Sequence, residues 1–405
     1  MSVVSPGLAN LAMLATFASW MLGGEAIAET YYVSPSGSDN RVRVQAQDRS
    51  TPWQTLQHAV NNAGSGDTVI ALEGTYDENV FLPRGGFPGQ PFTLKAEYRE
   101  AARLLGWIGC NDRSHLLVDG FDVTNNSPTG ITKGIQMTRC SHVTVRDCRV
   151  RNCFGGGIGF DQSDWIQCEW NIVHDNAFFD VNQHSGISVY QPQYRGDSDE
   201  RYGVIIRNNT SFGNKNLVNN PDFGRPTDGN GIVVDDFFNS QSGGNEVAYD
   251  RMSVIENNIC FDNGGQGVHC YRSQNVRIRN NTCVNNMESF DFGGEVSVSE
   301  SERVNVYNNI LVAREGKRAA LKFDSRDVYF GFNLINGPVR DVPYDRNSVY
   351  RPPFFEPGSF RLRGYSPAIN KGRRYDYFFL DAYGQPRMGR GQRVDLGAVE
   401  RQREW

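Results

Sequence analysis

The chain has 405 residues, with 41 basic and 46 acidic side chains and a formal net charge of -5. This length can bury a long core in one elongated domain, and the balanced charge, without a long basic run, excludes nucleic acid as an expected partner. The 43 glycines, together with the many Asn residues of the central part, favour tight turns over helices.

The N-terminus has the pattern of an export signal. An apolar stretch over residues 11–22 precedes Ala-Ile-Ala at 26–28, a small-x-small sequence that is typical of a cleavage site. We therefore predict a signal peptide over 1–28 and a secreted or periplasmic location in a bacterium. The apolar stretch is short for a membrane span, so we expect no membrane contact after the signal is removed.

Residues 30–76 are predicted to form an entry module. The sequence YYVSPSGSD predicts a strand and a turn, and GDTVIALEGTY predicts a second strand. Between them, a helix is expected from Thr51 to about Ala63, with Leu56, Ala59 and Val60 on one face. An amphipathic helix over the open end of a stack of coils would cap its core.

An asparagine then recurs once per repeat, between two short apolar strands. These asparagines are Asn171, Asn209, Asn258, Asn281, Asn309 and Asn333. Spacings near two dozen residues, lengthened by insertions, predict stacked coils, and thus an all-β parallel β-helix over 29–337. We expect each Asn side chain to hydrogen-bond its copies in the neighbouring coils.

Strand alternation predicts which side chains face the core and which face solvent. Two residues after each Asn, the inward column is Val173, Ser211, Cys260, Cys283, Leu311 and Ile335. The eight cysteines contain no CxxC pair of the zinc type, so we interpret Cys260 and Cys283 as small buried residues.

Both ends of the chain resemble one known group. YYVSPSGSD, TPWQTLQHAVNNAGSGDTVIALEGTYDE, SPAINKG from Ser366 and DAYGQPRMGRGQRVDLGAVE from Asp381 are similar to exported right-handed parallel β-helix proteins of bacteria, which include family 9 pectate lyases. The resemblance implies a right-handed β-helix and an irregular C-terminal segment over 338–405 packed on it. These motifs are architectural and name no reaction.

The catalytic residues of family 9 are not matched. The coil after GIVVDDF reads GGQGVHCYRS, without the calcium-binding Asp cluster of that family, and the next has Ser297 where a lysine is expected. GIVVDDF is also similar to the nucleophile strand of β-helical family 120 xylosidases. Their acid Glu, however, corresponds to Tyr271 here.

The strand that closes each coil carries two outward columns. The first is Gln136, Gly159, Ser188, Val233, His269, Ser297 and Lys322, and the second is Thr138, Asp161, Tyr190, Asp235, Tyr271, Ser299 and Asp324. Four long insertions, around His184, after Tyr190, around Asp228 and after Asp236, would wall this face into a cleft. Such a cleft suits an extended sugar polymer.

We therefore predict catalytic residues in this cleft, together with residues that bind the substrate. The catalytic candidates are Asp235, His269, His184 and Tyr271. The substrate-binding candidates are Tyr190, Gln191, Asp161, Asp236, Arg272, Glu295 and Lys322.

Three chemical interpretations remain open for these residues. In an inverting hydrolase, Asp235 would pair with Asp161 or Glu295. In a lyase, Asp228, Asp235 and Asp236 would hold Ca²⁺ against a uronate. The lyase base would be His269, Lys322 or Arg272, and the acid Tyr190 or Tyr271. In the third interpretation the Asp and Asn residues only cap turns.

The preferred function is an exported enzyme that cleaves an extended, uronic polysaccharide as a lyase. The alternatives are an inverting glycoside hydrolase and a non-catalytic glycan-binding surface or matrix protein. Calcium is the one cofactor considered, and we expect a monomer.

Overall fold

The computed structural model describes residues 28–289, 292–374, 380–387 and 393–402. Apart from Ala28, the predicted signal peptide lies outside the described residues. Among the described helices, none has the length and apolarity needed to cross a membrane.

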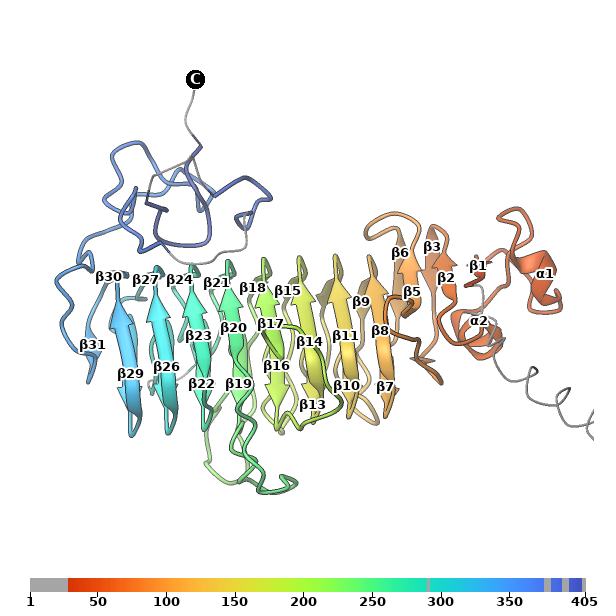
Figure 1. Ribbon diagram of the computed structural model, residues 1–405, viewed down its shortest axis with the longest axis horizontal. Helices are drawn as coiled ribbons and strands as arrows, with labels where there is room; N and C mark the ends of the chain where they lie inside the picture. Colours follow the sequence, from red (N-terminus) through yellow and green to blue (C-terminus); the bar gives the residue numbers. More distant parts are fainter. Residues whose placement is uncertain (1–27, 290–291, 375–379, 388–392, 403–405) are drawn as a thin grey trace, which may run out of the picture.

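The described chain winds into coils, each of which adds one strand to each of three parallel sheets (Figure 1). Sheet I contains β1 (Thr30–Val33), β2 (Thr68–Ala71), β5 (Phe92–Ala96), β8 (Ser114–Asp119), β11 (Ser141–Arg146), β14 (Asp164–Glu169), β17 (Val204–Arg207), β20 (Ser253–Glu256), β23 (Val276–Arg279), β26 (Glu302–Tyr307) and β29 (Arg326–Gly331). Sheet II contains β4 (Val80–Phe81), β7 (Ile108–Asn111), β10 (Ile135–Thr138), β13 (Ile158–Asp161), β16 (Ile187–Tyr190), β19 (Ile232–Asp235), β22 (Val268–Tyr271), β25 (Val296–Ser299), β28 (Ala320–Phe323) and β31 (Val339–Arg340). Sheet III contains β3 (Gly74–Tyr76), β6 (Ala102–Leu105), β9 (Asp122–Thr124), β12 (Arg149–Arg151), β15 (Ile172–His174), β18 (Thr210–Phe212), β21 (Ile259–Phe261), β24 (Thr282–Val284), β27 (Ile310–Val312) and β30 (Leu334–Asn336). The predicted parallel β-helix is confirmed.

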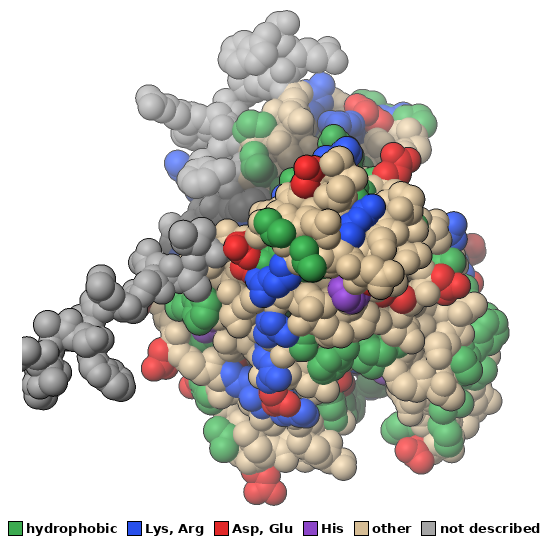
Figure 2. Space-filling model, turned by 90° about the vertical axis from the view of Figure 1, so that its right-hand side faces the viewer, with side chains coloured by type: hydrophobic (Ala, Val, Ile, Leu, Met, Phe, Trp, Pro, Cys, Tyr) green, Lys and Arg blue, Asp and Glu red, His purple; other side chains and the backbone are tan. Residues whose placement is uncertain are grey.

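The N-terminal end of the core is covered by the predicted helix, α2 (Leu56–Asn62). The Thr55 hydroxyl caps it by accepting a hydrogen bond from the His58 N–H, and Leu56, Ala59 and Val60 are buried. A second short helix, α1 (Arg43–Ala46), was not expected. Seen from this end, the surface mixes basic, acidic and apolar side chains (Figure 2).

The repeating asparagines form the predicted ladder. From Asn171 to Asn309 each side-chain amide donates to the Asn oxygen of the next coil, at 3.0–3.1 Å, and the ladder ends at Asn333. All six are buried, and each amide also donates to a backbone carbonyl. The predicted inward column is also confirmed, with Cys260 paired in register with Cys283. All eight cysteines are buried free thiols.

A second asparagine ladder, which we did not predict, follows sheet III. It runs through Asn176, Asn214, Asn263 and Asn286, each side-chain amide donating to the next Asn oxygen at 2.8–2.9 Å. Glu295 ends it by accepting from both the backbone N–H and the side-chain amide of Asn286. In the four coils from Asn171 to Asn286 the two ladders hold two corners, and so they fix the sheet II strand that follows the second corner.

The described residues beyond 338 pack along the first ladder's corner. The side chains of Asn208, Asn257 and Asn308 donate to the backbone carbonyls of residues 381, 380 and 373, respectively. Sheet II extends to Arg340 through β31, slightly past the predicted end of the β-helix at 337.

Candidate functional site

The pocket that brings together five of the predicted site residues, Asp161, His184, Tyr190, Asp228 and Asp235, lies on sheet II, over β13, β16 and β19. It has a volume of about 340 Å³ and is lined by Lys133, Asp161, Asn182, Gln183, His184, Ser185, Ser188, Tyr190, Asp228, Val233 and Asp235. The four long loops are 175–186 and 213–231 before the strands, and 191–203 and 236–252 after them. In Figure 1, loops beside β19 project from the lower edge of the molecule. In Figure 2, the same lower edge is seen from the N-terminal end and has a hollow between two projecting lobes.

Asp235 ends β19 and aligns with Tyr190 of β16, which aligns with Asp161 of β13. Burial raises the pKa of Asp235 to about 8, and the carboxyl of Asp228 adds to the rise. A hydrogen bond of 2.9 Å from the Gln241 amide opposes this rise without cancelling it. Burial also raises the pKa of Asp228 to about 6. Asp235 is therefore protonated near neutral pH, as a proton donor needs to be.

His184 is held by an aspartate that the sequence analysis missed. The buried Asp180 carboxylate lies 2.9 Å from His184 Nδ1 and also accepts from the Thr132 hydroxyl and the Asn182 N–H. Burial opposes ionisation of Asp180, but these bonds and the imidazole outweigh it and lower the pKa of Asp180 to about 2. The carboxylate thus keeps the proton on Nδ1, and Nε2 has no hydrogen-bond partner among the described residues.

Lys133 is a second pocket residue that sequence reasoning missed. Its ammonium lies 3.3 Å from the Asp161 carboxylate, and its side chain is buried in the pocket wall. Lys133 directly precedes Gly134, the residue before β10. Ser185 holds the equivalent place two coils later, directly before the glycine that precedes its sheet II strand, and it lines the same pocket. Inspecting the residue before each of these glycines in the sequence could therefore have identified Lys133.

The tyrosines and the second histidine lie on the same face of sheet II. Burial and the charges of Asp235, Asp236 and Asp161 raise the pKa of Tyr190 to about 12, and its hydroxyl donates to the Ser242 carbonyl at 3.3 Å. His269 and Tyr271 follow on β22, with ring centroids 5.6 Å apart. Neither lines the Asp235 pocket.

Burial lowers the pKa of His269 to about 4, so this ring is neutral at physiological pH. Arg272, the residue after β22, forms an ion pair with Glu300 at 3.1 Å and lies over the Tyr271 ring. This predicted group lies one coil beyond the pocket and adjoins it, because His269 pairs with Val233 and Tyr271 with Asp235.

Two predicted substrate-binding residues, Asp236 and Gln191, are buried in loop structure instead. Asp236 has a φ of 52°, so the strand ends there and the side chain turns away from the face that carries Asp235. Its carboxylate accepts from Ser240, from the Gln241 N–H and from the Gln191 amide. The predicted role of both residues in the cleft is therefore wrong: they hold the loop 236–252.

The predictions for Glu295 and Lys322 are also corrected. Glu295 is fully buried because it ends the second Asn ladder, and burial raises its pKa to about 8. Lys322 pairs with Val298, a core residue, whereas Leu321 pairs with Ser297 in the His269 column. The expected register was thus shifted by one residue, which moves Lys322 to the other side of its strand.

The predicted calcium ligands are not brought together as a set of three. Asp228 accepts from the Asn230 amide at 2.8 Å, and Asp236 is enclosed by its loop. Within the described part of the chain, no group of three or more His, Cys, Asp or Glu side chains has the geometry of a metal site. The residues present therefore do not fit the expected ion, and no chemical step is assigned to it.

Known proteins share the fold of this chain. Residues 106–193 match the family model for the right-handed beta helix region. A Bacillus subtilis (strain 168) protein, uncharacterized protein YwoF, is 24% identical over 211 residues, which are 47% of this chain and 44% of that protein. The chain thus spans less than half the length of the curated relative it matches.

Two solved structures are similar over most of the chain. Pectate lyase Pel9A is 16% identical, with a TM-score of 0.57 over 94% of this chain and 98% of that one. A structure named glycoside hydrolase is 9% identical, with a TM-score of 0.53 over 80% of this chain and 96% of that one. At this identity the similarity shows the fold, and the predicted right-handed β-helix is confirmed.

Proposed function

We propose that this protein is an exported polysaccharide lyase that cleaves an extended uronic polymer in the sheet II pocket. The observation that carries the proposal is a histidine oriented by a buried aspartate, His184–Asp180, in the same pocket as a carboxyl whose pKa is raised to about 8, Asp235. A base and an acid in one pocket are what an elimination requires. The sequence signal for export supports the location.

The elimination assigns one task to each group. His184 Nε2 removes the C5 proton of a uronate, the electron pair forms the C4–C5 double bond, and the C4–O4 bond breaks. Asp235 gives its proton to the departing O4 oxygen. Lys133, although shared with Asp161, places a positive charge where the substrate carboxylate gains negative charge as C5 loses its proton. Similarity to the structure named pectate lyase Pel9A supports a uronic substrate.

A second candidate, an inverting glycoside hydrolase, is favoured by one observation. Asp235 and Asp161 end strands two coils apart, which places their Cα atoms about 10 Å apart at the ordinary strand spacing. An inverting pair of carboxyls is separated by about 6.5–9.5 Å, so that a water molecule fits between the base and the sugar. In this candidate Asp235 is the acid and Asp161 the base.

The experiment incubates the purified protein with a panel of uronic and neutral polysaccharides. Unsaturated ends are followed by ultraviolet absorbance and reducing ends by a colorimetric assay. The lyase yields both signals from a uronic polymer, whereas the hydrolase yields reducing ends alone. No product from any polymer, together with binding of a glycan that survives Asp235→Asn, would assign the protein to non-catalytic glycan binders. Undiminished product from Asp235→Asn would remove that residue from the site.

A further inference from the structure

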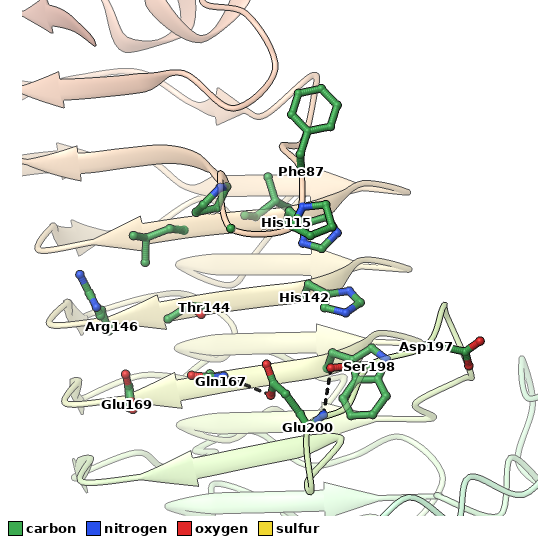
Figure 3. A pocket seen from close by; sticks show the side chains of 16 residues that line it. Phe87, His115, His142, Thr144, Arg146, Gln167, Glu169, Asp197, Ser198 and Glu200 are labelled. Atoms are coloured by element: carbon green, nitrogen blue, oxygen red, sulfur yellow. Dashed lines mark hydrogen bonds between the residues drawn. The ribbon is translucent and has the colours of Figure 1, made fainter. Parts of the chain in front are cut away.

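A larger groove lies on sheet I, on a different sheet from the proposed catalytic pocket. It has a volume of about 530 Å³ and crosses β8, β11 and β14 (Figure 3). Its floor is Leu117, Thr144 and Gln167, three side chains in one column of paired strands. One end is closed by the loop at 87–91, the other by the loop at 197–200.

One wall of the groove is a column of three rings. His115, His142 and Trp165 occupy the same place in consecutive coils, with φ values of 56°, 54° and 50°. Strand pairing skips these residues, since Ser141 pairs with Ser114 and with Asp164 but His142 has no partner. Each therefore lies at a left-handed kink that all three strands share, and the kink turns its side chain out of the regular alternation.

The rings pack on one another along the coil axis. The centroids of His115 and His142 are 4.4 Å apart and stacked, and those of His142 and Trp165 are 5.9 Å apart. The Arg251 guanidinium covers the Trp165 ring at 4.3 Å. The left-handed backbone is shared by later coils of the same sheet, at Arg303 and Asp327, whereas the three stacked rings are found at the groove.

The groove offers unused hydrogen-bonding capacity. His142 Nδ1 is buried and has no hydrogen-bond partner within the part of the chain that the structure describes. Burial lowers the pKa of His115, and the neighbouring His142 lowers it further. The His115 imidazole is therefore uncharged near pH 7. The Gln167 amide nitrogen donates to Glu200 at 3.3 Å, so the Gln167 carbonyl oxygen and the Thr144 hydroxyl are the further polar groups beside the apolar Leu117. This mixture fits the hydroxyl-bearing and C–H-bearing faces of a sugar.

The charges of the groove select against a polyanion. Arg146 is paired with Asp119 at 2.9 Å, and Glu169 with Arg207 at 2.8 Å. Among the described residues that line the groove, Asp197 and Glu200 have no ion-pair partner, and both lie at one end (Figure 3). The residual charge is therefore negative, and it repels a uronic chain while leaving a neutral sugar unaffected.

We propose that the sheet I groove is a second glycan-binding site, which takes a segment of neutral oligosaccharide. It does not depend on the chemistry proposed for sheet II, because no residue lines both cavities. Both sites can be occupied at once, and a protein that holds a neutral glycan on sheet I presents its sheet II pocket to a different polymer.

The test is calorimetric titration of the full protein with cellohexaose, xylohexaose, mannohexaose and hexagalacturonate. Thr144→Arg fills the floor of the groove. Asn305→Arg is the matched control, because Asn305 is an exposed residue of the same column on β26. We expect at least one neutral hexasaccharide to bind, with an affinity lowered about tenfold or more by Thr144→Arg and unchanged in Asn305→Arg and Lys133→Met.

A second readout protects the test against a folding defect in Thr144→Arg. Binding to the unmodified protein should shift the ring NMR signals of His115 and His142 and leave those of His174 in place. The proposal is overturned if no neutral hexasaccharide binds, if hexagalacturonate binds in the groove more tightly, or if Lys133→Met abolishes binding. Unshifted His115 and His142 signals on saturation would overturn it equally.

Discussion

Replacing Asp235 with asparagine should change the pH dependence of stability in a defined direction. The pKa of Asp235 is about 8 in the folded protein, against an ordinary value of 3.8. The folded protein therefore keeps a proton that the unfolded chain releases. The stability that this group contributes is fully present below about pH 4 and is lost as the pH rises to about 8.

Asparagine cannot ionise, so the variant escapes this loss. Roughly three pKa units lie between pH 5 and the folded pKa, and each is worth about 1.36 kcal/mol. The free energy of unfolding of Asp235→Asn, relative to the unmodified protein, should thus rise by about 4 kcal/mol between pH 5 and pH 9. Solvent that reaches the pocket reduces this value, so about 2 kcal/mol is the least we expect.

Equilibrium urea unfolding at pH 5 and pH 9 measures this difference. Asp324→Asn, which alters an exposed aspartate after β28, is the control and should show no comparable change. If the difference between Asp235→Asn and the unmodified protein is the same at both pH values, Asp235 is already ionised at pH 5. The assignment of this residue as a proton donor is then wrong.

Three further outcomes follow from the contacts. Asn258→Ala removes an acceptor for two N–H donors of the preceding coil and should lower the free energy of unfolding by about 3 kcal/mol or more, whereas exposed Asn126→Ala should not. Glu295→Gln should lower the urea midpoint yet leave the rate of polymer cleavage unchanged, because Glu295 only ends a ladder; a fall in rate at equal folding would contradict this. Chelation of calcium should leave the cleavage rate unchanged, and loss of activity that added Ca²⁺ restores would refute that expectation.

The fold was predictable because its signals repeat. The first Asn column, the inward residues and the strands of sheet II recur with a fixed order, so an error in one coil is corrected by its neighbours. The position of Asp235 in the column of Asp161 and Tyr190 followed from this register. The pattern that ends with Glu295 was missed in part because two of its asparagines, Asn176 and Asn214, lie at the edge of the long loops.

The site was less predictable because much of it lies outside the repeat. Asp180 belongs to the loop 175–186, where no periodicity reports which side chains meet. Asp236 adjoins a strand, but its left-handed backbone breaks the alternation. For Lys322, β28 has apolar residues at both alternate positions, so alternation could not fix the register.

The most direct test of the account is the rate of unsaturated-end formation from a polyuronate by His184→Ala. His174→Ala is the matched control, because His174 also lies 2.7 Å from an aspartate oxygen, on Asp175, but stands on sheet III, stacked on Phe212. We predict that His184→Ala lowers the rate by a factor on the order of 10²–10⁴, that added imidazole restores part of it, and that His174→Ala leaves it unchanged. Cleavage by His184→Ala at the unmodified rate would contradict the central claim that this histidine is the base.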